Sequence, residues 1–220
     1  MEHCIIVGSS GHAHSVLEVI ESERQYKAIG FLDDFRISGE LEHGLPILGI
    51  TDNCAKIAQT NNASIFFLAV GDNWGRSLLH DKIKNLCPSA KFPGLVHPKT
   101  VISKTVTIPD ACVILPGTVV GRYATLGIGC LLNHQSCLDH DASLGDYASL
   151  GPQATIGGRT NIGIFSAICM GANVLQQIKI GSHSIIGSGS IVTKDIPDQV
   201  IAYGTPCVVR KSRHIGDHYL

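Results

Sequence analysis

Residues 139–141, with the sequence Asp-His-Asp, are the group in this chain best suited to acid–base chemistry. Histidine has an unperturbed pKa of about 6.5, so it can accept a proton from a reacting group at neutral pH. A neighbouring carboxylate can orient the imidazole ring and stabilise its protonated form. We therefore expect His140 to act as a general base and Asp141 to support it, while Asp139 is expected to be a solvated side chain.

A second candidate group follows the first apolar run of the chain, in the segment "VGSSGH" at residues 7–12. Gly8, Ser10, Gly11 and His12 lie where a predicted strand turns into a predicted helix. Backbone N–H groups and the helix dipole at such a turn favour a phosphate group. The spacing is not the full GxGxxG pattern, so a dinucleotide is only weakly indicated, and a plain turn is the alternative.

Two acids, Asp33 and Asp34, end the next apolar run. An acid at the end of the second strand of such a domain commonly accepts a hydrogen bond from a ribose or a base. Together with the glycine-containing turn, these acids predict a site for a nucleoside diphosphate. The alternative is a solvated acidic loop.

The first 95 residues alternate between strand and helix patterns, which predicts a small doubly wound parallel sheet. The predicted strands are "HCIIVG", "YKAIGFLDD" and "ASIFFLAVGDN", and the predicted helices are "AHSVLEVIESE", "NCAKIAQTNN" and "WGRSLLHDKIKNL". The segment "GLPILG" is expected to be a loop or a short strand. The carboxyl ends of the strands would bring the turn and the two acids to one edge, and Pro93 to Pro98 would form the hinge to the second half.

An aliphatic residue occupies every sixth position from Ile102 to Val192, often followed by glycine. This period fits neither an α-helix nor a flat alternating strand. It is typical of a parallel β-helix in which the aliphatic residues point inward and three hexads complete one coil. The segment "NVLQQIKIG" at 173–181 is expected to bulge outward or to meet a neighbouring chain. The tail from Cys207 to Leu220 is expected to be a short helix or loop.

The composition of the chain limits the classes of function. Its 220 residues carry a formal net charge of −1 and are 44% hydrophobic, and the scattered basic residues argue against nucleic acid as a partner. The N-terminus does not resemble a signal peptide, and no apolar run approaches the roughly 20 residues that span a bilayer. The eight cysteines lack CxxC pairs and are expected to be reduced thiols. We therefore expect a cytoplasmic protein with no membrane partner.

The order of the two halves resembles the NeuD/PglD-like family of sugar O- and N-acetyltransferases, and within it the nucleotide-amino-sugar N-acetyltransferases. The motifs that carry this resemblance are "GSSGH", "FLDD", "VGDN", "VHP", "LLNHQSCLDHDASLGD" and "AYGTP". The resemblance implies a left-handed β-helix, a homotrimer with active sites between subunits, acetyl-CoA as cosubstrate and no metal. It also implies a Rossmann-like nucleotide-sugar-binding domain at 1–95, an acetyltransferase domain at 96–206 and a tail at 207–220.

The same resemblance assigns roles to individual residues. Those expected to bind the nucleotide sugar are Gly8, Ser10, Gly11, His12, Asp33, Asp34 and Asn73. Those expected at acetyl-CoA are Asn133, His134, Ser149, Gly158, Gly187 and Gly204. The backbone N–H of Gly158 would meet the acetyl carbonyl and stabilise an oxyanion. Ser149 is a departure, because some members of the family have a histidine near the thioester at this position.

The resemblance implies acetyl transfer from acetyl-CoA to the 4-amino group of a UDP- or GDP-linked 4-amino-4,6-dideoxy sugar in bacterial glycan biosynthesis. We expect a direct attack with His140 as base. O-acetylation of sialic acid, another sugar or serine is the alternative, since a histidine–carboxylate pair can also activate a hydroxyl. A zinc lyase would need ligands such as His134, His140 and His183, but their spacing does not resemble that of such enzymes. A non-catalytic scaffold would leave the nucleotide-type turn unexplained, and an acylated Cys137 is disfavoured because no neighbour clearly lowers its pKa.

Overall fold

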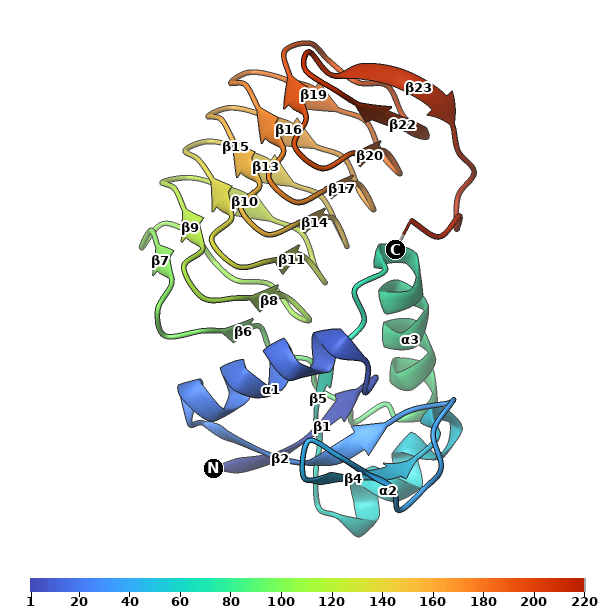
Figure 1. Cartoon of the computed structure of the whole chain (residues 1–220). Coiled ribbons are helices and arrows are strands. Elements are labelled where there is room, and N and C mark those ends of the chain that lie inside the picture. Colours follow the sequence, from blue (N-terminus) through green and yellow to red (C-terminus); the bar gives the residue numbers. More distant parts are fainter. Residues whose placement is uncertain (220) are drawn as a thin grey trace.

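The computed structural model describes residues 1–219, which form an α/β domain followed by a parallel β-helix (Figure 1). The sheet of the first domain has the order β3-β4-β2-β1-β5, and all its strands except β3 are parallel. Its strands are β1 (Glu2–Val7), β2 (Tyr26–Leu32), β3 (Leu41–Glu42), β4 (Leu45–Gly49) and β5 (Ile65–Leu68). The helices are α1 (Gly11–Glu23), α2 (Cys54–Thr60) and α3 (Asn73–Leu86), with a 3₁₀ helix η1 at Thr51–Asn53. The predicted strand–helix alternation is confirmed, and "GLPILG" contains a strand.

Strand β1 supplies both cores of this domain, because successive side chains of a strand point to opposite faces. Cys4 and Ile6 pack with α1, whereas Ile5 and Val7 pack with residues of α2 and α3. All four side chains are fully buried, and each aliphatic one stabilises the fold by roughly 1.5–3 kcal/mol. The core on the α1 side continues into the β-helix through Val113, Leu115 and Leu131, so the two parts of the chain share one apolar core.

The β-helix consists of short strands stacked on three faces, and all of them are parallel except the last one of the chain, which is antiparallel to the strand before it. The first face contains β6 (Leu95–Val96), β8 (Val113–Ile114), β11 (Leu131–Leu132), β14 (Ser149–Leu150), β17 (Ala167–Ile168), β20 (Ile185–Ile186), β22 (Val200–Tyr203) and β23 (Val208–Ser212). The second face contains β7 (Val101–Ile102), β9 (Val119–Val120), β12 (Cys137–Leu138), β15 (Thr155–Ile156), β18 (Asn173–Val174) and β21 (Ile191–Val192). The third face contains β10 (Thr125–Leu126), β13 (Ser143–Leu144), β16 (Asn161–Ile162) and β19 (Lys179–Ile180).

The hexad repeat predicted this arrangement, since the second residue of each short strand is the aliphatic one and lies in one continuous core. Buried hydroxyls satisfy carbonyl groups where the chain turns; Ser166 Oγ donates to the Gly181 carbonyl at 2.6 Å. Gly127 shows why glycine often follows the aliphatic residue. A Cβ at Gly127 would lie 2.4 Å from the backbone nitrogen of Asp146 in the next coil.

The structure corrects two expectations about the end of the β-helix. Residues 173–181 do not bulge, because Asn173 and Val174 pair in register with Ile191 and Val192 while Leu175 turns outward. A contact of this segment with a neighbouring chain stays a prediction. The tail is neither helix nor only loop, since β23 pairs antiparallel with β22. The backbone groups at the open edge of the last coil need hydrogen-bond partners, and β23 provides them.

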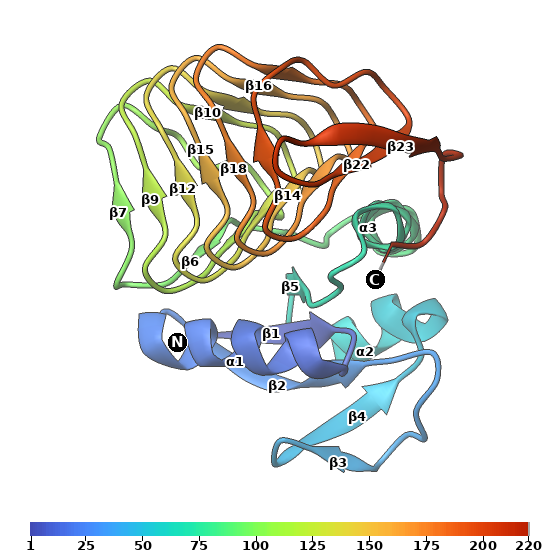
Figure 2. The same ribbon diagram turned by 45° about the horizontal axis from the view of Figure 1, so that its top comes forward.

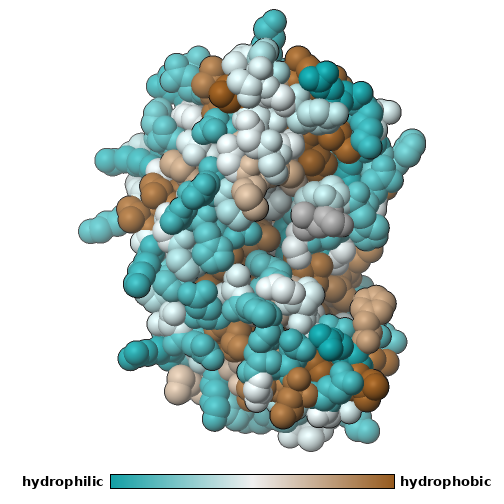
Figure 3. Space-filling model, in the orientation of Figure 1, coloured by the Kyte–Doolittle hydropathy of each residue, from teal (hydrophilic) through white to brown (hydrophobic). Residues whose placement is uncertain are grey.

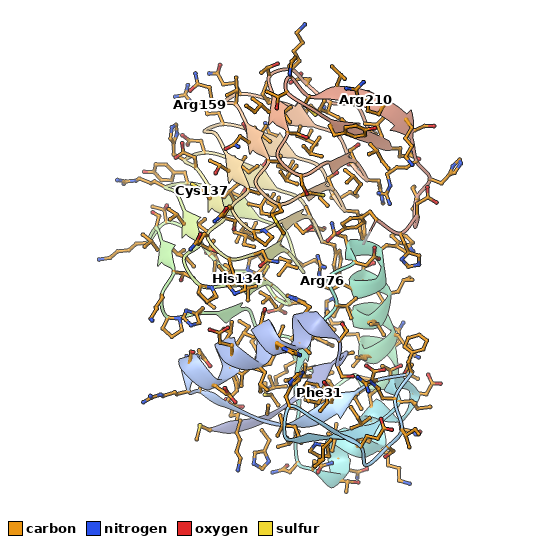
Figure 4. The ribbon with its side chains drawn as sticks, viewed as in Figure 1. Phe31, Arg76, His134, Cys137, Arg159 and Arg210 are labelled. Atoms are coloured by element: carbon orange, nitrogen blue, oxygen red, sulfur yellow. The ribbon has the colours of Figure 1, made fainter. Side chains whose placement is uncertain are left out.

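Arg76 of α3 joins the first domain to the β-helix (Figure 4). Its buried guanidinium donates to the carbonyl oxygens of Gly129 and Tyr147 in the β-helix and to those of Val70 and Gly71 in the loop before α3. A buried guanidinium needs acceptors for its N–H groups, so these bonds hold the loop against the coils.

An aromatic column forms the other part of this contact. The rings of Tyr147, Phe165 and His183, one coil apart, stack with centroid distances of 5.3 and 4.8 Å. Trp74 of α3 packs against Phe165 and His183. Figure 2 shows the result, with α1 below the coils and α3 seen end-on beside them. The start of α3 is thereby fixed relative to the β-helix.

The surface in the orientation of Figure 1 is mixed in polarity. Figure 3 shows hydrophilic residues over both domains, with apolar residues between them in separate groups. Within residues 1–219, no helix is long and apolar enough to cross a membrane.

Candidate functional site

A pocket of about 490 Å³ lies between the first domain and the first face of the β-helix. The first domain contributes the start of α1 and the loop after β5, and the β-helix contributes β11, β14, β17 and the turns beside them. Residues that line the pocket include His12, Gly71, Asn133, Ser149, Cys169 and Tyr219. The carboxyl ends of the parallel strands meet the coils here, which is the edge at which open α/β sheets bind ligands.

The turn after β1 is shaped by Gly8 and Asp33. Gly8 has a φ of +92°, and a Cβ there would lie 3.1 Å from the Ala69 carbonyl oxygen. Ser9 donates to Asp33 Oδ2 from its backbone N–H at 3.0 Å and from its hydroxyl at 2.6 Å. Asp33 Oδ1 accepts the backbone N–H of Phe35 at 2.9 Å. The carboxylate of Asp33 thus ties the turn to the end of β2.

The neighbouring acid, Asp34, also has partners within the fold. Its Oδ1 accepts the backbone N–H of Thr51 at 2.7 Å, and its Oδ2 lies 3.4 Å from Lys82 Nζ. Burial opposes ionisation, but hydrogen bonds from Thr51 and the charge of Lys82 outweigh it and lower the pKa of Asp34. Asp34 therefore anchors η1 and is a carboxylate at neutral pH.

His12 lines the pocket from the first turn of α1. Its buried Nε2 has no hydrogen-bond partner among residues 1–219. Burial, and then the positive charges of Arg76 and His134, lower the pKa of His12 to about 4. The ring is therefore neutral at neutral pH and needs no counter-ion, and its Nε2 is a buried polar atom in the wall of the pocket.

Asn133 and His134 lie at the corner between β11 and β12. Asn133 Oδ1 accepts the backbone N–H of His134 and lies 2.8 Å from His134 Nδ1. Asn133 lines the pocket, and His134 is close enough to His12 to lower its pKa. Ser149, on β14, contributes a buried hydroxyl. The structure therefore brings His12, Asn133 and Ser149 together. His134 lies beside them, on the side of the coils that faces the first domain (Figure 4).

His140 lies at the next corner, between β12 and β13, where its side chain is half exposed. Its Nδ1 lies 2.8 Å from Asp141 Oδ2, and Asp139 Oδ1 accepts the backbone N–H of His140 at 2.7 Å. An Nδ1–H that donates to the carboxylate leaves Nε2 as the basic nitrogen. Asp139 is therefore a cap of this corner rather than only a solvated side chain.

Gly158 lies one coil after His140 and directly beneath its ring. A Cβ at Gly158 would be 2.6 Å from His140 Nε2, so only glycine leaves room for this ring position. The backbone N–H of Gly158 donates to no acceptor in the described part of the chain, whereas Arg159 N–H donates to the His140 carbonyl. An unpartnered N–H thus lies next to the basic nitrogen.

Within one chain the two groups are separate. The corner that carries His140 joins the second and third faces, whereas the pocket opens on the first face. His140, Asp141 and Gly158 therefore form one group, and His12, Asn133 and Ser149 form another.

Several other predicted residues have structural partners. Asn73 is buried, and its amide bonds the carbonyl oxygens of Phe165 and Ser166 and the guanidinium of Arg76. A Cβ at Gly187 would lie 2.8 Å from the Cβ of Tyr203. None of these residues lines the pocket.

The remaining predicted residues lie at the start of α1 and at the end of β22. Gly204 follows β22 with a φ of +112°. Ser10 is the N-cap residue of α1 but makes no side-chain capping bond, and a Cβ at Gly11 would meet nothing within 4 Å. The space beside Gly11 is therefore open at the start of the helix.

Sequence reasoning missed most of the residues that line the pocket, among them Gly71 and Tyr219. Gly71 follows β5, and Tyr219 arrives from the end of the chain. The motif "VGDN" marked the loop of Gly71, but its tertiary position depends on Arg76. Tyr219 has no signal in the sequence, since it lies beyond the repeat.

The zinc-lyase alternative finds no support within one chain. His134, His140 and His183 lie at three different corners of the coils. Among residues 1–219, the cluster with metal-ligand spacing is His14, Glu42 and His43, and none of these lines the pocket.

Comparison with known proteins agrees with this architecture. The family model of the PglD N-terminal domain matches residues 3–83. The acetyltransferase domain of PglB from Neisseria gonorrhoeae, solved with acetyl coenzyme A, is 30% identical, with a TM-score of 0.88 over 95% of this chain and 99% of its own. The chain belongs to the NeuD/PglD-like family of sugar acetyltransferases. It is an acetyl-CoA-dependent acyltransferase, with the expected Rossmann-like domain and left-handed parallel β-helix.

Two further relatives differ in their acceptors. PerB from Caulobacter crescentus, solved with CoA and GDP-perosamine, is 26% identical, with a TM-score of 0.89 over 96% of this chain and 98% of its own. The galactoside O-acetyltransferase of Lactococcus lactis is 53% identical over 47 residues, which are 21% of this chain and 23% of that protein. The chain thus spans about a quarter of the length of this curated relative.

Proposed function

We propose that this NeuD/PglD-like acyltransferase transfers the acetyl group of acetyl-CoA to the 4-amino group of a UDP- or GDP-linked 4-amino-4,6-dideoxy sugar. The observation that carries this proposal is the pocket between the nucleotide-type turn and the coils, with the neutral, unpartnered His12 in its wall. The likeness to PerB, which was solved with CoA and GDP-perosamine, supports a nucleotide-linked amino sugar as acceptor.

In the proposed reaction the amine nitrogen attacks the carbonyl carbon of the thioester, and the carbon–sulfur bond breaks. His140 Nε2 takes the proton of the amine, and this proton then passes to the departing CoA sulfur. Asp141 holds Nδ1 and stabilises the imidazolium, and the free N–H of Gly158 stabilises the oxyanion. A base of this kind contributes roughly 10²–10⁴ in rate, and the rest comes from holding the two substrates together.

The proposal requires a second copy of the chain. Since His140 and the pocket lie on different sides of one β-helix, His140 of one subunit would complete the pocket of another. A homotrimer with active sites between subunits, as the family resemblance implies, meets this requirement. The division into a nucleotide-sugar domain at 1–95, an acetyltransferase domain at 96–206 and a tail at 207–220 belongs to the same proposal. The cytoplasmic location stays a prediction.

The direct test measures CoA thiol release from acetyl-CoA with a panel of UDP- and GDP-linked 4-amino-4,6-dideoxy sugars. Release that depends on one of these amino sugars is the expected result, and the 4-hydroxy sugar nucleotide is the matched control. No release with any amino sugar would contradict the proposal.

O-acetylation is the second candidate, and the similarity to galactoside O-acetyltransferase favours it. The same assay separates the two functions if galactosides, sialic acid and serine are added to the panel. Turnover with one of these hydroxyl acceptors, and none with the amino sugars, would support O-acetyl transfer.

A further inference from the structure

The last residues of the chain form a strap across the pocket, which we define as residues 213–219. After β23 the chain turns back from the far end of the coils toward the start of α3 (Figure 1). Arg213 holds the first part, since its guanidinium donates to the carbonyl oxygens of His183 at 2.9 Å and of Asp217. Asp217 in turn accepts the backbone N–H of His214 at 2.8 Å. The strap thus has a defined turn of its own.

The strap is also fitted to α3. Gly216 has a φ of +84°, and a Cβ there would lie 3.3 Å from Trp74 Nε1, so both conformation and space favour glycine. His218 Nδ1 lies 3.8 Å from Asp72 Oδ2, next to the N-terminus of α3. The strap therefore contacts the first domain as well as the β-helix.

Tyr219, at the end of the strap, lines the pocket. Its hydroxyl lies 3.4 Å from the Gly71 carbonyl oxygen and 3.4 Å from Ser149 Oγ. The Arg213 guanidinium lies 5.9 Å from the ring centre. Both hydroxyl contacts are long for O–H···O hydrogen bonds, which are usually near 2.7–2.8 Å. The hydroxyl is thus held in the pocket without a strong partner.

The position of Tyr219 indicates which ligand it would meet. Gly71 and His12 follow the carboxyl ends of β5 and β1, at the edge where a diphosphate would bind the Gly8 turn. A sugar attached to that diphosphate would extend toward Ser149 on the first face. Tyr219 lies between these two walls, where it would meet the sugar rather than the nucleoside.

We infer that Tyr219 is a specificity-determining residue, whose hydroxyl donates a hydrogen bond to an oxygen atom of the acceptor sugar while the strap covers the pocket. This inference rests on the proposed function. It also requires the strap to move aside when the acceptor enters and leaves, because the ring occupies the wall of the pocket. Its burial raises the pKa of Tyr219, so the phenol stays protonated and able to donate at neutral pH.

The test compares Tyr219→Phe with the wild-type protein. Loss of one hydrogen bond predicts a rise of about 3- to 10-fold in the KM for the nucleotide-linked amino sugar, with the KM for acetyl-CoA unchanged. Tyr26→Phe is the matched control, because Tyr26 packs edge-to-face against Phe67 in the first domain and does not line the pocket. An unchanged acceptor KM in Tyr219→Phe would overturn the inference.

A second variant separates recognition from folding. A chain that ends at Gly216 lacks Tyr219 but keeps β23, and we expect a larger rise in acceptor KM with a melting temperature close to that of the wild type. An equal rise in the KM values of acceptor and acetyl-CoA, together with a lower melting temperature, would mean that the strap is only structural. If the wild-type protein acetylates no nucleotide-linked amino sugar, both the proposed function and this inference fail. Wild-type turnover with an unchanged KM in both variants contradicts only the role of Tyr219.

Discussion

His12 and His140 differ in the burial of their rings and in the hydrogen-bond partners of their ring nitrogens. His12 is in the pocket, lacks a partner for Nε2 and has a pKa lowered to about 4. His140 is half exposed at a corner of the coils, and a carboxylate holds its Nδ1. A neutral ring without a counter-ion suits recognition, whereas a ring with an orienting carboxylate suits proton transfer. The comparison teaches that surroundings, rather than residue type, divide binding from catalysis in this chain.

The largest effect is expected from removing the base. His140→Ala should lower kcat by about 10²–10⁴, because the amine then has no group to take its proton. The oligomeric state should not change, since the side chain lies outside the core of the coils. Steady-state kinetics and light scattering check the two expectations, with His3→Ala, an exposed histidine on β1, as the control. A kcat within twofold of the wild type would assign the base to another residue.

A smaller loss is expected when the ring of His140 is moved rather than removed. Gly158→Ala places a Cβ 2.6 Å from Nε2 in the present geometry, so the ring must shift, and kcat should fall about 10- to 100-fold. The double variant with His140→Ala shows whether the effect acts through this ring. We expect no further loss in the double variant, whereas additive losses would mean that Gly158 acts independently of His140.

The next prediction concerns His12 and the pH dependence of the free energy of unfolding rather than kcat. Because the folded pKa of His12 is lowered from about 6.5 to about 4, the unfolded chain takes up a proton that the folded chain does not. The free energy of unfolding should therefore fall as the pH drops from about 6.5 to about 4, by at most about 3 kcal/mol. Urea titrations across this range should give a weaker pH dependence for His12→Asn. An identical slope in both proteins would refute a buried neutral His12.

The smallest effect on activity is expected at Asn73. Its amide bonds two carbonyl oxygens of the β-helix and Arg76, so Asn73→Ala should cost about 1–3 kcal/mol of stability. The KM for the nucleotide sugar should stay within twofold of the wild type. A large rise in this KM without a loss of stability would restore Asn73 to the substrate site.

The sequence predicted the parts of this molecule that repeat or that follow local rules. The period of six predicted the coils, because each aliphatic residue has the same environment in every turn. The Asp-His-Asp segment predicted the His140–Asp141 contact, because adjacent residues at a tight corner can touch. Strand-to-helix alternation likewise placed Gly8 and Asp33 at one edge of the sheet. In the structure, Ser9 of the same turn donates two hydrogen bonds to Asp33.

The parts that could not be predicted depend on contacts between distant segments. Arg76 is fully buried only because carbonyl groups from two domains surround it, and nothing in its own helix indicates this. The strand of the tail forms because the last coil leaves an open edge. Tyr219 enters the pocket because the strap is anchored by Arg213 and fitted to Trp74.

Mixed oligomers of two variants test the central claim, that in the proposed homotrimer the pocket of one subunit is completed by His140 of another. One variant is His140→Ala, and the other is His12→Trp, in which a larger ring fills the pocket. Each should be nearly inactive alone. Unfolding and refolding an equal mixture should restore activity to about a quarter of the wild-type level, because about one interface in four then has an intact His12 and an intact His140. No recovery in refolded mixed trimers would contradict the account and place both histidines of each site in one chain.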